Sequence, residues 1–132
     1  MAERTVIDLS NQDINSVPDS QLLDKGDEVE IRITGMLSGE DKNNLPYIMF
    51  FYDVPENPNV DEISDFVGLP STVREERDNV KNRRRLKAIG EFFGIDWSQP
   101  QQIDDVKGLR GFAIVGLNKE RTQNTVAEYL RK

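Results

Sequence analysis

The chain contains neither cysteine nor histidine. Without cysteine it can form no disulfide and no thiolate metal site. Without histidine it lacks the commonest general base and a frequent metal ligand. Glycine-rich phosphate-binding loops of the GxxxxGK[ST] or GxGxxG type are also missing. These absences predict a protein that is not an enzyme and that uses no metal or other cofactor.

Long apolar runs are absent as well. The longest, around residues 48–52 and 112–117, fall far short of the ~20 residues that cross a bilayer. The N-terminus opens with charged residues and has no apolar signal-peptide segment. We therefore expect a cytoplasmic protein without membrane contact, and the length of 132 residues suits a single hydrophobic core.

The charge is unevenly distributed along the chain. The net charge is −7, but residues 1–70 carry 15 acidic and 4 basic side chains, whereas residues 71–132 carry 9 acidic and 13 basic ones. Binding of a polyanion responds to the local field rather than to the total charge. The acidic total therefore does not exclude a basic groove for nucleic acid.

The first half of the chain predicts an arm and three strands. Scattered apolar residues over 1–24 indicate an extended arm. Apolar and polar side chains alternate over residues 28–34, which predicts a half-buried strand, and Gly35 predicts a bulge or bend in it. Residues 45–54 predict a second strand that is apolar on both faces, and residues 60–69 a weaker third strand.

The second half predicts one helix and two strands. The helix begins with a cap at Ser71 or Thr72 and ends just before Gly94. Strands are expected over residues 109–117 and 125–130, with a charged turn between them.

This order of elements favours the OB-fold, a five-stranded Greek-key barrel with a helix between strands three and four. Residues 25–132 would form this mainly β (α+β) domain, with the arm of residues 1–24 packed on the barrel. SH3-like barrels and other α+β folds remain open, because element order does not fix topology.

Several short motifs support a resemblance over residues 17–130: Val17-Pro18, Leu22-Leu23-Asp24-Lys25-Gly26-Asp27, Gly68-Leu69-Pro70, Leu86-Lys87-Ala88-Ile89-Gly90-Glu91-Phe92-Phe93-Gly94-Ile95-Asp96, Val106-Lys107-Gly108-Leu109-Arg110-Gly111-Phe112 and Asn124-Thr125-Val126. By these motifs the chain resembles small phage proteins of replication and recombination modules that are regarded as OB-fold single-stranded DNA-binding proteins. The resemblance implies single-stranded DNA as ligand, replication or recombination proteins as partners, and the cytoplasm of an infected bacterium as location. Many bacterial single-strand binders end in an acidic tail, and the ending Arg131-Lys132 departs from that pattern.

Binding of single strands requires aromatic faces for base stacking and cations along the backbone. The stacking candidates lie in the second strand: Tyr47, Phe51 and Tyr52. An alternative interpretation places Tyr52 in the core with Phe50, and Tyr47 and Phe51 under the N-terminal arm.

The cationic candidates lie mainly on the helix, at Lys81, Arg83, Arg84, Arg85 and Lys87. Charge runs on helices are often only a solvated face, which is the alternative here. Arg32 on the first strand fits an electrostatic track, or a cross-strand pair with a carboxylate. The remaining candidates lie in predicted loops: Lys42, Lys119 and Arg121.

Two functions from different classes are compatible with these features. The first is sequence-tolerant binding of single-stranded DNA by stacking and electrostatics. The second is a protein–protein adaptor, for instance a homodimer, whose acidic first half and two-sided apolar strands form interfaces. A carboxylate-dependent hydrolase has no supporting constellation, since Glu75-Glu76 suit a helix N-terminus and Asp104-Asp105 a solvated loop.

Overall fold

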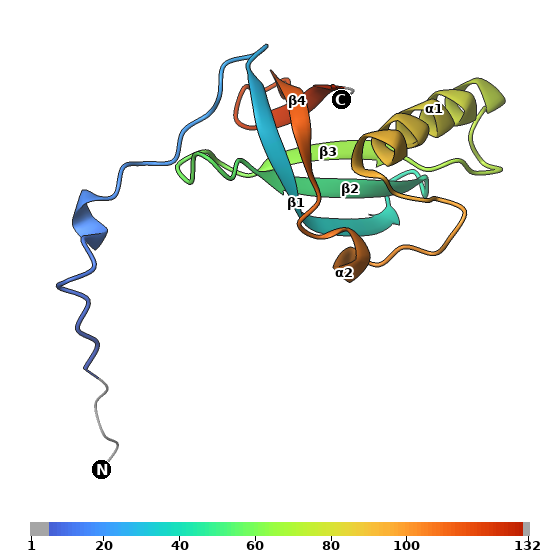
Figure 1. Cartoon of the computed structure of the whole chain (residues 1–132). Coiled ribbons are helices and arrows are strands. Elements are labelled where there is room, and N and C mark those ends of the chain that lie inside the picture. The colour runs from blue at the N-terminus through green and yellow to red at the C-terminus, as the bar shows by residue number, and fades with distance from the viewer. Residues whose placement is uncertain (1–5, 131–132) are drawn as a thin grey trace.

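The barrel and its helix are arranged as the element order predicted. The computed structural model describes residues 6–130, so the basic ending Arg131-Lys132 lies outside the described part. The strands are β1 (Glu28–Glu40), β2 (Pro46–Asp53), β3 (Ile63–Gly68), β4 (Arg110–Leu117) and β5 (Asn124–Tyr129). The helices are α1 (Glu76–Phe93), the short α2 (Ile103–Val106) and a 3-10 turn, η1 (Ile14–Ser16). The five strands form a closed barrel, with α1 between β3 and β4 in sequence and beside the barrel in space, which confirms the predicted OB-fold arrangement (Figure 1).

Strand β1 is long enough to take part in both halves of the barrel. The strand order is β1-β2-β3-β5-β4, and β1 pairs with β4 through its first half and with β2 through its second. A register shift between Ile33 and Gly35 marks a bulge at the change of partner. Such a bulge bends the strand and allows a small barrel to close. The prediction for Gly35 is therefore confirmed, although β1 continues beyond it to Glu40.

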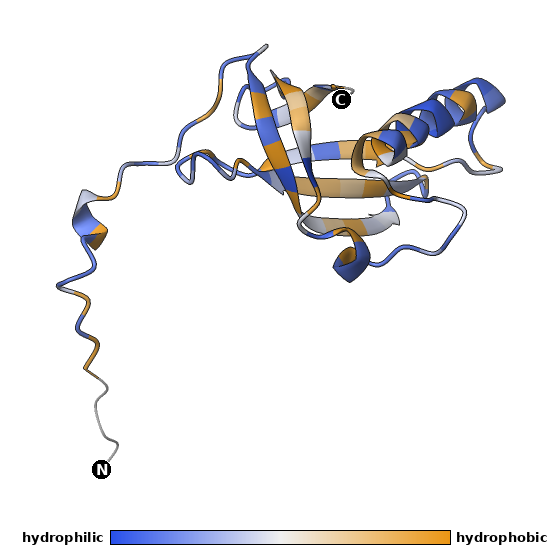
Figure 2. Cartoon of the chain, viewed as in Figure 1, coloured by the Kyte–Doolittle hydropathy of each residue, from blue (hydrophilic) through white to orange (hydrophobic). Residues whose placement is uncertain are grey.

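The core consists of the inward-facing side chains of the strands and one side of α1. Alternate residues of β1 and β2 are buried, as the period of two requires, and Figure 2 shows the alternation along β1. Helix α1 adds Ile89, Phe92 and Phe93, and the ring of Phe93 stacks against that of Tyr52 with centroids 5.9 Å apart. This contact fixes which side of β2 faces the helix.

Helix α1 begins later than the sequence indicated. Its N-cap is Glu75, so the predicted caps at Ser71 or Thr72 are wrong. Ser71 is instead bound by the helix side chain Asn79, whose Oδ1 accepts from the Ser71 N–H at 2.9 Å and whose Nδ2 donates to the Ser71 carbonyl at 2.8 Å. At the other end Gly94 adopts φ 74°, as a C-cap glycine does.

Within the described part of the N-terminal arm, residues 6–24, the contacts with the barrel lie at the last residues. Gln21 forms a bridge with Val60, and Leu23 exchanges two backbone hydrogen bonds with the Asn124 side chain at 2.8 and 3.0 Å. Residues 6–20 are exposed and extend away from the barrel (Figure 1), so of residues 6–24 only the end of the arm packs on the barrel as expected, and residues 1–5 lie outside the described part. Within residues 6–130, no helix has the length and apolar character needed to span a membrane.

Candidate nucleic-acid interface

The outer face of β2 carries a row of large side chains that point away from the core. Tyr47, Met49 and Phe51 are half-buried, while the alternating residues between them are buried inside the barrel. A strand projects successive side chains to opposite faces, so these three share the outer surface. Two of them are the predicted stacking residues Tyr47 and Phe51.

Neighbouring strands extend this outer surface on both sides of β2. Met49 is paired with Leu37 of β1 and with Phe66 of β3. The ring of Phe66 lies 4.8 Å from that of Tyr47, centroid to centroid, at an angle of 33°. We refer to the five outer residues Leu37, Tyr47, Met49, Phe51 and Phe66 as the aromatic platform.

Small residues flank the two rings of β2. Phe51 is paired with Gly35, where an added Cβ would lie 3.3 Å from Phe51 Cδ2. Tyr47 is paired with Gly39, where an added Cβ would lie 3.0 Å from the Tyr47 hydroxyl oxygen. A Cβ atom at either position would be closer to the ring than an ordinary van der Waals contact. Glycine at positions 35 and 39 therefore lets each ring pack directly against the backbone of β1. The platform consequently offers ring faces rather than a ridge of side chains.

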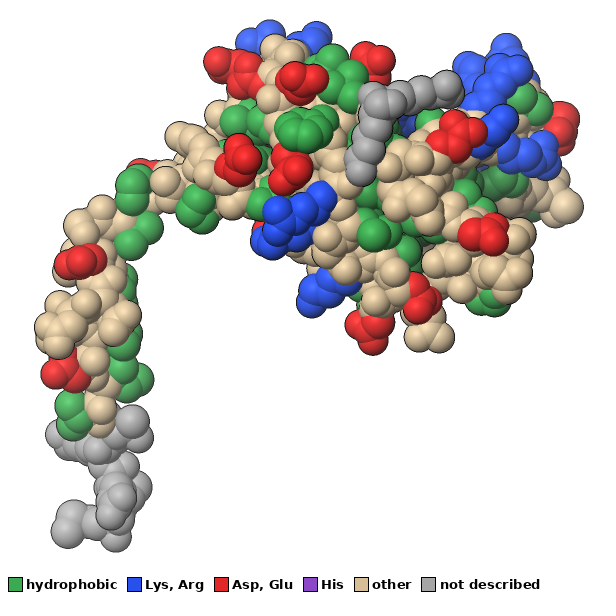
Figure 3. Space-filling view, in the orientation of Figure 1, with side chains coloured by type: hydrophobic (Ala, Val, Ile, Leu, Met, Phe, Trp, Pro, Cys, Tyr) green, Lys and Arg blue, Asp and Glu red, His purple; other side chains and the backbone are tan. Residues whose placement is uncertain are grey.

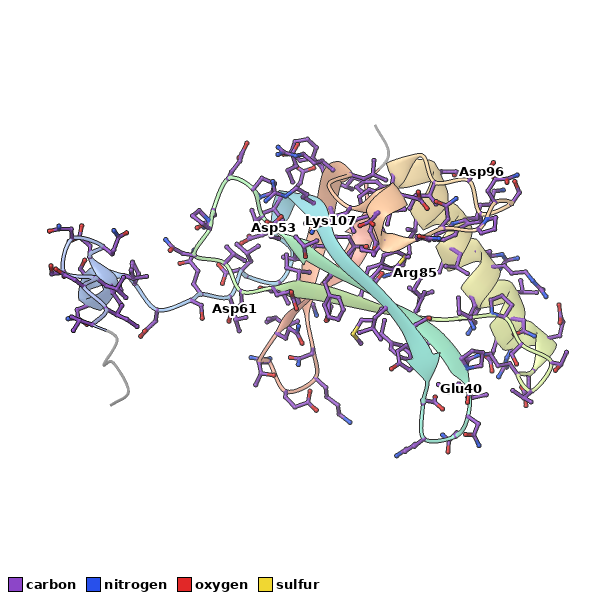
Figure 4. The ribbon with its side chains drawn as sticks, turned by 90° about the horizontal axis from the view of Figure 1, so that it is seen from below. Glu40, Asp53, Asp61, Arg85, Asp96 and Lys107 are labelled. Atoms are coloured by element: carbon purple, nitrogen blue, oxygen red, sulfur yellow. The ribbon has the colours of Figure 1, made fainter. Side chains whose placement is uncertain are left out.

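A short loop borders the platform at the far end of the β1–β2 pairing. In Figure 4 this loop, next to Glu40, and the loop between β4 and β5 project toward the same side of the molecule. Asp41 organises the first loop, because one carboxylate oxygen accepts hydrogen bonds from the N–H groups of Asn43 (2.8 Å) and Leu45 (3.0 Å). These bonds, that to Leu45 above all, lower the pKa of Asp41. Lys42 is exposed at the tip of the loop.

The loop between β4 and β5 is organised by a single amide side chain. Asn118 Oδ1 accepts from the N–H groups of Thr122 (2.8 Å) and Gln123 (3.1 Å). The predicted cations Lys119 and Arg121 are exposed in this loop. The two loops are therefore ordered turns that present cations, in the positions where OB-folds hold oligonucleotides.

Arg32 and Arg74 lie at the two ends of the platform and bind different partners. Arg32 forms a two-point ion pair with Asp53, its partner across β1 and β2, with Nε 3.0 Å from Oδ1. The cross-strand alternative for Arg32 is thus the one observed. Arg74 donates to the carbonyl oxygens of Pro46 (2.7 Å) and Leu69 (2.9 Å), and within residues 6–130 it has no carboxylate in ion-pair range. Sequence reasoning missed Arg74, because a lone arginine before a helix has no distinguishing pattern.

Tyr52 and Arg85 belong to a buried polar network. Tyr52 is completely buried, so its prediction as a stacking residue is wrong. Its hydroxyl lies 2.7 Å from that of Tyr129, which donates to Asp65 at 2.6 Å. Arg85 Nη2 lies 2.9 Å from both Asp65 oxygens and donates to the Val126 carbonyl at 3.1 Å. Arg85 thus links the helix to β3 and β5. This contact corrects the prediction that Arg85 contacts DNA. Burial raises the pKa of both tyrosines.

The other helix cations lie on the exposed surface of α1. Arg83 pairs with Glu76 at 2.8 Å, and Lys81, Arg84 and Lys87 are exposed on α1. Figure 3 shows basic side chains gathered over α1.

Helix α1 packs Phe93 against Tyr52 on the core side of β2. Its Asn82 side chain lies beside Gly68, the β3 partner of Tyr47. The contacts within residues 6–130 do not join the exposed helix cations to the rings of β2, so the expected single track stays a prediction.

Phe66 is the aromatic residue of the platform that sequence reasoning missed. It alternates with the buried Asp65 and Val67 and is exposed. A period of two was present in this segment, but an acidic residue at an inward position obscured it.

Among residues 6–130, no three acidic side chains gather as a metal site would require. A scan against models of known protein families finds no match to the chain. A search of curated proteins likewise finds no significant relative. The resemblance to phage single-stranded DNA-binding proteins therefore stays a prediction, and the functional argument depends on the geometry of the barrel.

Proposed function

We propose that the chain binds single-stranded DNA on the aromatic platform without strong sequence preference, in phage replication or recombination as the resemblance implies. The observation that carries the proposal is the cross-strand arrangement of rings on β2 and β3, with glycines beside two of them. Every base has a face that stacks on an aromatic ring, so such a surface tolerates sequence. The same region of other OB-folds binds oligonucleotides.

The charges around the platform favour one path for the strand. Lys42 lies in the loop between β1 and β2, and Arg74 lies beside Gly68 at the end of β3. Lys119 and Arg121 lie in the loop before β5. Thr125 of β5 is paired with Ser64, the β3 partner of Phe51.

On the adjoining outer face of β1 and β4, Arg110 offsets the charge of Glu30, whereas Glu28 repels phosphate. We infer that the bases stack on β2 and β3 while the phosphates follow the loop cations.

The experiment compares two phenylalanines of equal exposure. Phe66, on the platform, is 52% exposed, and Phe112, on the outer face of β4, is 51% exposed. Binding of a fluorescently labelled oligo-dT is measured by polarisation for Phe66→Ala and Phe112→Ala. A lost stacking contact costs about 1–3 kcal/mol, so we expect affinity to fall roughly 5- to 150-fold for Phe66→Ala and to stay within about twofold for Phe112→Ala.

Two results would contradict the proposal. The first is that the unchanged protein fails to bind oligo-dT even at low salt. The second is that both alanine variants bind equally well, because the rings of the platform would then make no contact with bases. Circular dichroism of both variants controls for loss of fold.

The adaptor function is supported by a different surface. An apolar groove runs along α1, on the side of β2 away from the platform. Its walls are mainly apolar and suit an apolar peptide segment. The two functions use separate faces and can coexist.

A further inference from the structure

The groove beside α1 has a volume of about 690 Å³. It lies between the helix, β2 and the segment that follows the helix, and its walls are mainly apolar: Ile48, Leu69, Leu86, Ile95 and Trp97. Arg83 and Lys87 stand on the rim along the middle of α1, and Glu91 and Asp96 lie toward its C-terminal end. An extended segment that brings apolar side chains and negative charge to the middle of the helix would complement this surface.

The N-terminal arm is such a segment. Its large apolar side chains are exposed and uncovered: Val6, Ile7, Leu9, Ile14 and Val17. Residues 6–24 contain Asp8, Asp13, Asp19 and Asp24 but no lysine or arginine. Contiguous exposed apolar groups rimmed by charge mark an interaction surface. The arm therefore combines apolar side chains that suit the groove walls with carboxylates that suit the cations on the groove rim.

We propose that two copies of the chain exchange arms, each arm lying in the groove beside α1 of the other copy. The arm leaves the barrel at the end away from α1 and points outward (Figure 1). Two molecules placed antiparallel would each bring an arm to the partner's helix, which gives a closed two-fold dimer. Apolar arm residues occupy the groove, and arm carboxylates approach Arg83 and Lys87.

The rim cations are free to take this role. Lys87 has no ion-pair partner within residues 6–130, and Arg83 contacts only the exposed Glu76 of its own helix. Surface pairs of this kind contribute little to stability and exchange partners readily. The platform lies on the other side of β2, so the dimer would present two platforms and leave both open.

A charge exchange between arm and groove tests the proposal on the full chain. One variant carries Arg83→Glu and Lys87→Glu in the groove, and the other carries Asp8→Lys and Asp19→Lys in the arm. All four side chains are exposed, so both variants should fold. Light scattering coupled to size exclusion should give a dimer for the unchanged protein and a monomer for each variant alone. An equimolar mixture of the two variants should again give a dimer, because every arm then meets a groove of opposite charge.

A matched control uses the same helix. Lys81→Glu with Arg84→Glu makes the same charge change at exposed positions that do not line the groove, and this variant should remain a dimer. The proposal is overturned if the unchanged protein is monomeric across a concentration series, as it would be if each arm folded onto its own groove. It is equally overturned if the mixture stays monomeric, or if the control loses the dimer as completely as the groove variant.

Discussion

The ring of Phe51 lies directly against Gly35. The two residues are paired across β1 and β2, and a Cβ at position 35 would lie 3.3 Å from Phe51 Cδ2. Gly35 also follows the bulge at which β1 changes partner. One glycine thus bends the strand that closes the barrel and makes room for a ring on its outer surface.

Gly35→Val should disturb the platform more than the fold. A valine side chain would occupy the space of the Phe51 ring and tilt that ring away from its present position. We expect the affinity for oligo-dT to fall about tenfold, within the range of one lost stacking contact. The double variant with Phe51→Ala should bind no more weakly than Phe51→Ala alone, because both changes remove the same contact. Additive losses in this polarisation cycle would show that Gly35 acts on binding by another route.

Arg85→Ala should destabilise the protein by about 3 kcal/mol. The substitution leaves the carboxylate of Asp65 buried without its cation, and breaking a buried ion pair from one side is costly. Urea denaturation followed by circular dichroism measures the change. The adjacent Arg84 provides the control, since it is exposed and Arg84→Ala should alter stability by less than about 0.5 kcal/mol. Equal effects of the two substitutions would contradict the role assigned to the network.

The period of two and the helix signals were sufficient to predict the barrel. Alternation placed the strands, although β1 runs to Glu40 rather than ending at residue 34; Gly35 predicted the bulge and Gly94 the end of α1. The start of α1 was misplaced because the Asn79 side chain, eight residues along the chain, binds the backbone of Ser71 in place of a cap. Such a bond depends on how the segment folds back on the helix, which local sequence does not encode.

The candidate site was predicted less completely, and the three consecutive arginines explain why. Arg83 pairs on the helix surface, Arg84 is exposed and Arg85 reaches the buried Asp65 of β3. Sequence spacing places all three on a charged helix but cannot identify a partner on a distant strand. The prediction that Tyr52 stacks on bases was wrong for a related reason. Strand β2 is apolar on both faces, so periodicity alone could not tell which face is inside.

Alkaline pH should destabilise the protein through Tyr52 and Tyr129. Burial raises the pKa of both phenols, whereas a tyrosine in the unfolded chain titrates near about 10. Below that pH both phenols are protonated in the folded and the unfolded state, and their contribution to the free energy of unfolding is complete. Above it only the unfolded state loses these protons, so the free energy of unfolding falls as pH rises. Urea denaturation between about pH 8 and about pH 11 should give a steeper decline for the unchanged protein than for Tyr52→Phe. Tyrosinate absorbance from both residues in the still-folded protein would contradict this expectation.

The salt dependence of DNA binding should distinguish the loop cations from those of the helix. Each phosphate contact contributes about 0.7 to the slope of log affinity against log salt for a single strand. Lys42→Ala and Lys119→Ala should therefore each reduce the slope by about this amount, because both residues lie in the loops that the phosphates are inferred to follow. Lys81→Ala and Arg84→Ala remove the same charge from α1, outside the inferred path of the phosphates, and should leave the slope unchanged. If the helix variants lower the slope and the loop variants do not, the strand follows α1 and the platform is not its path.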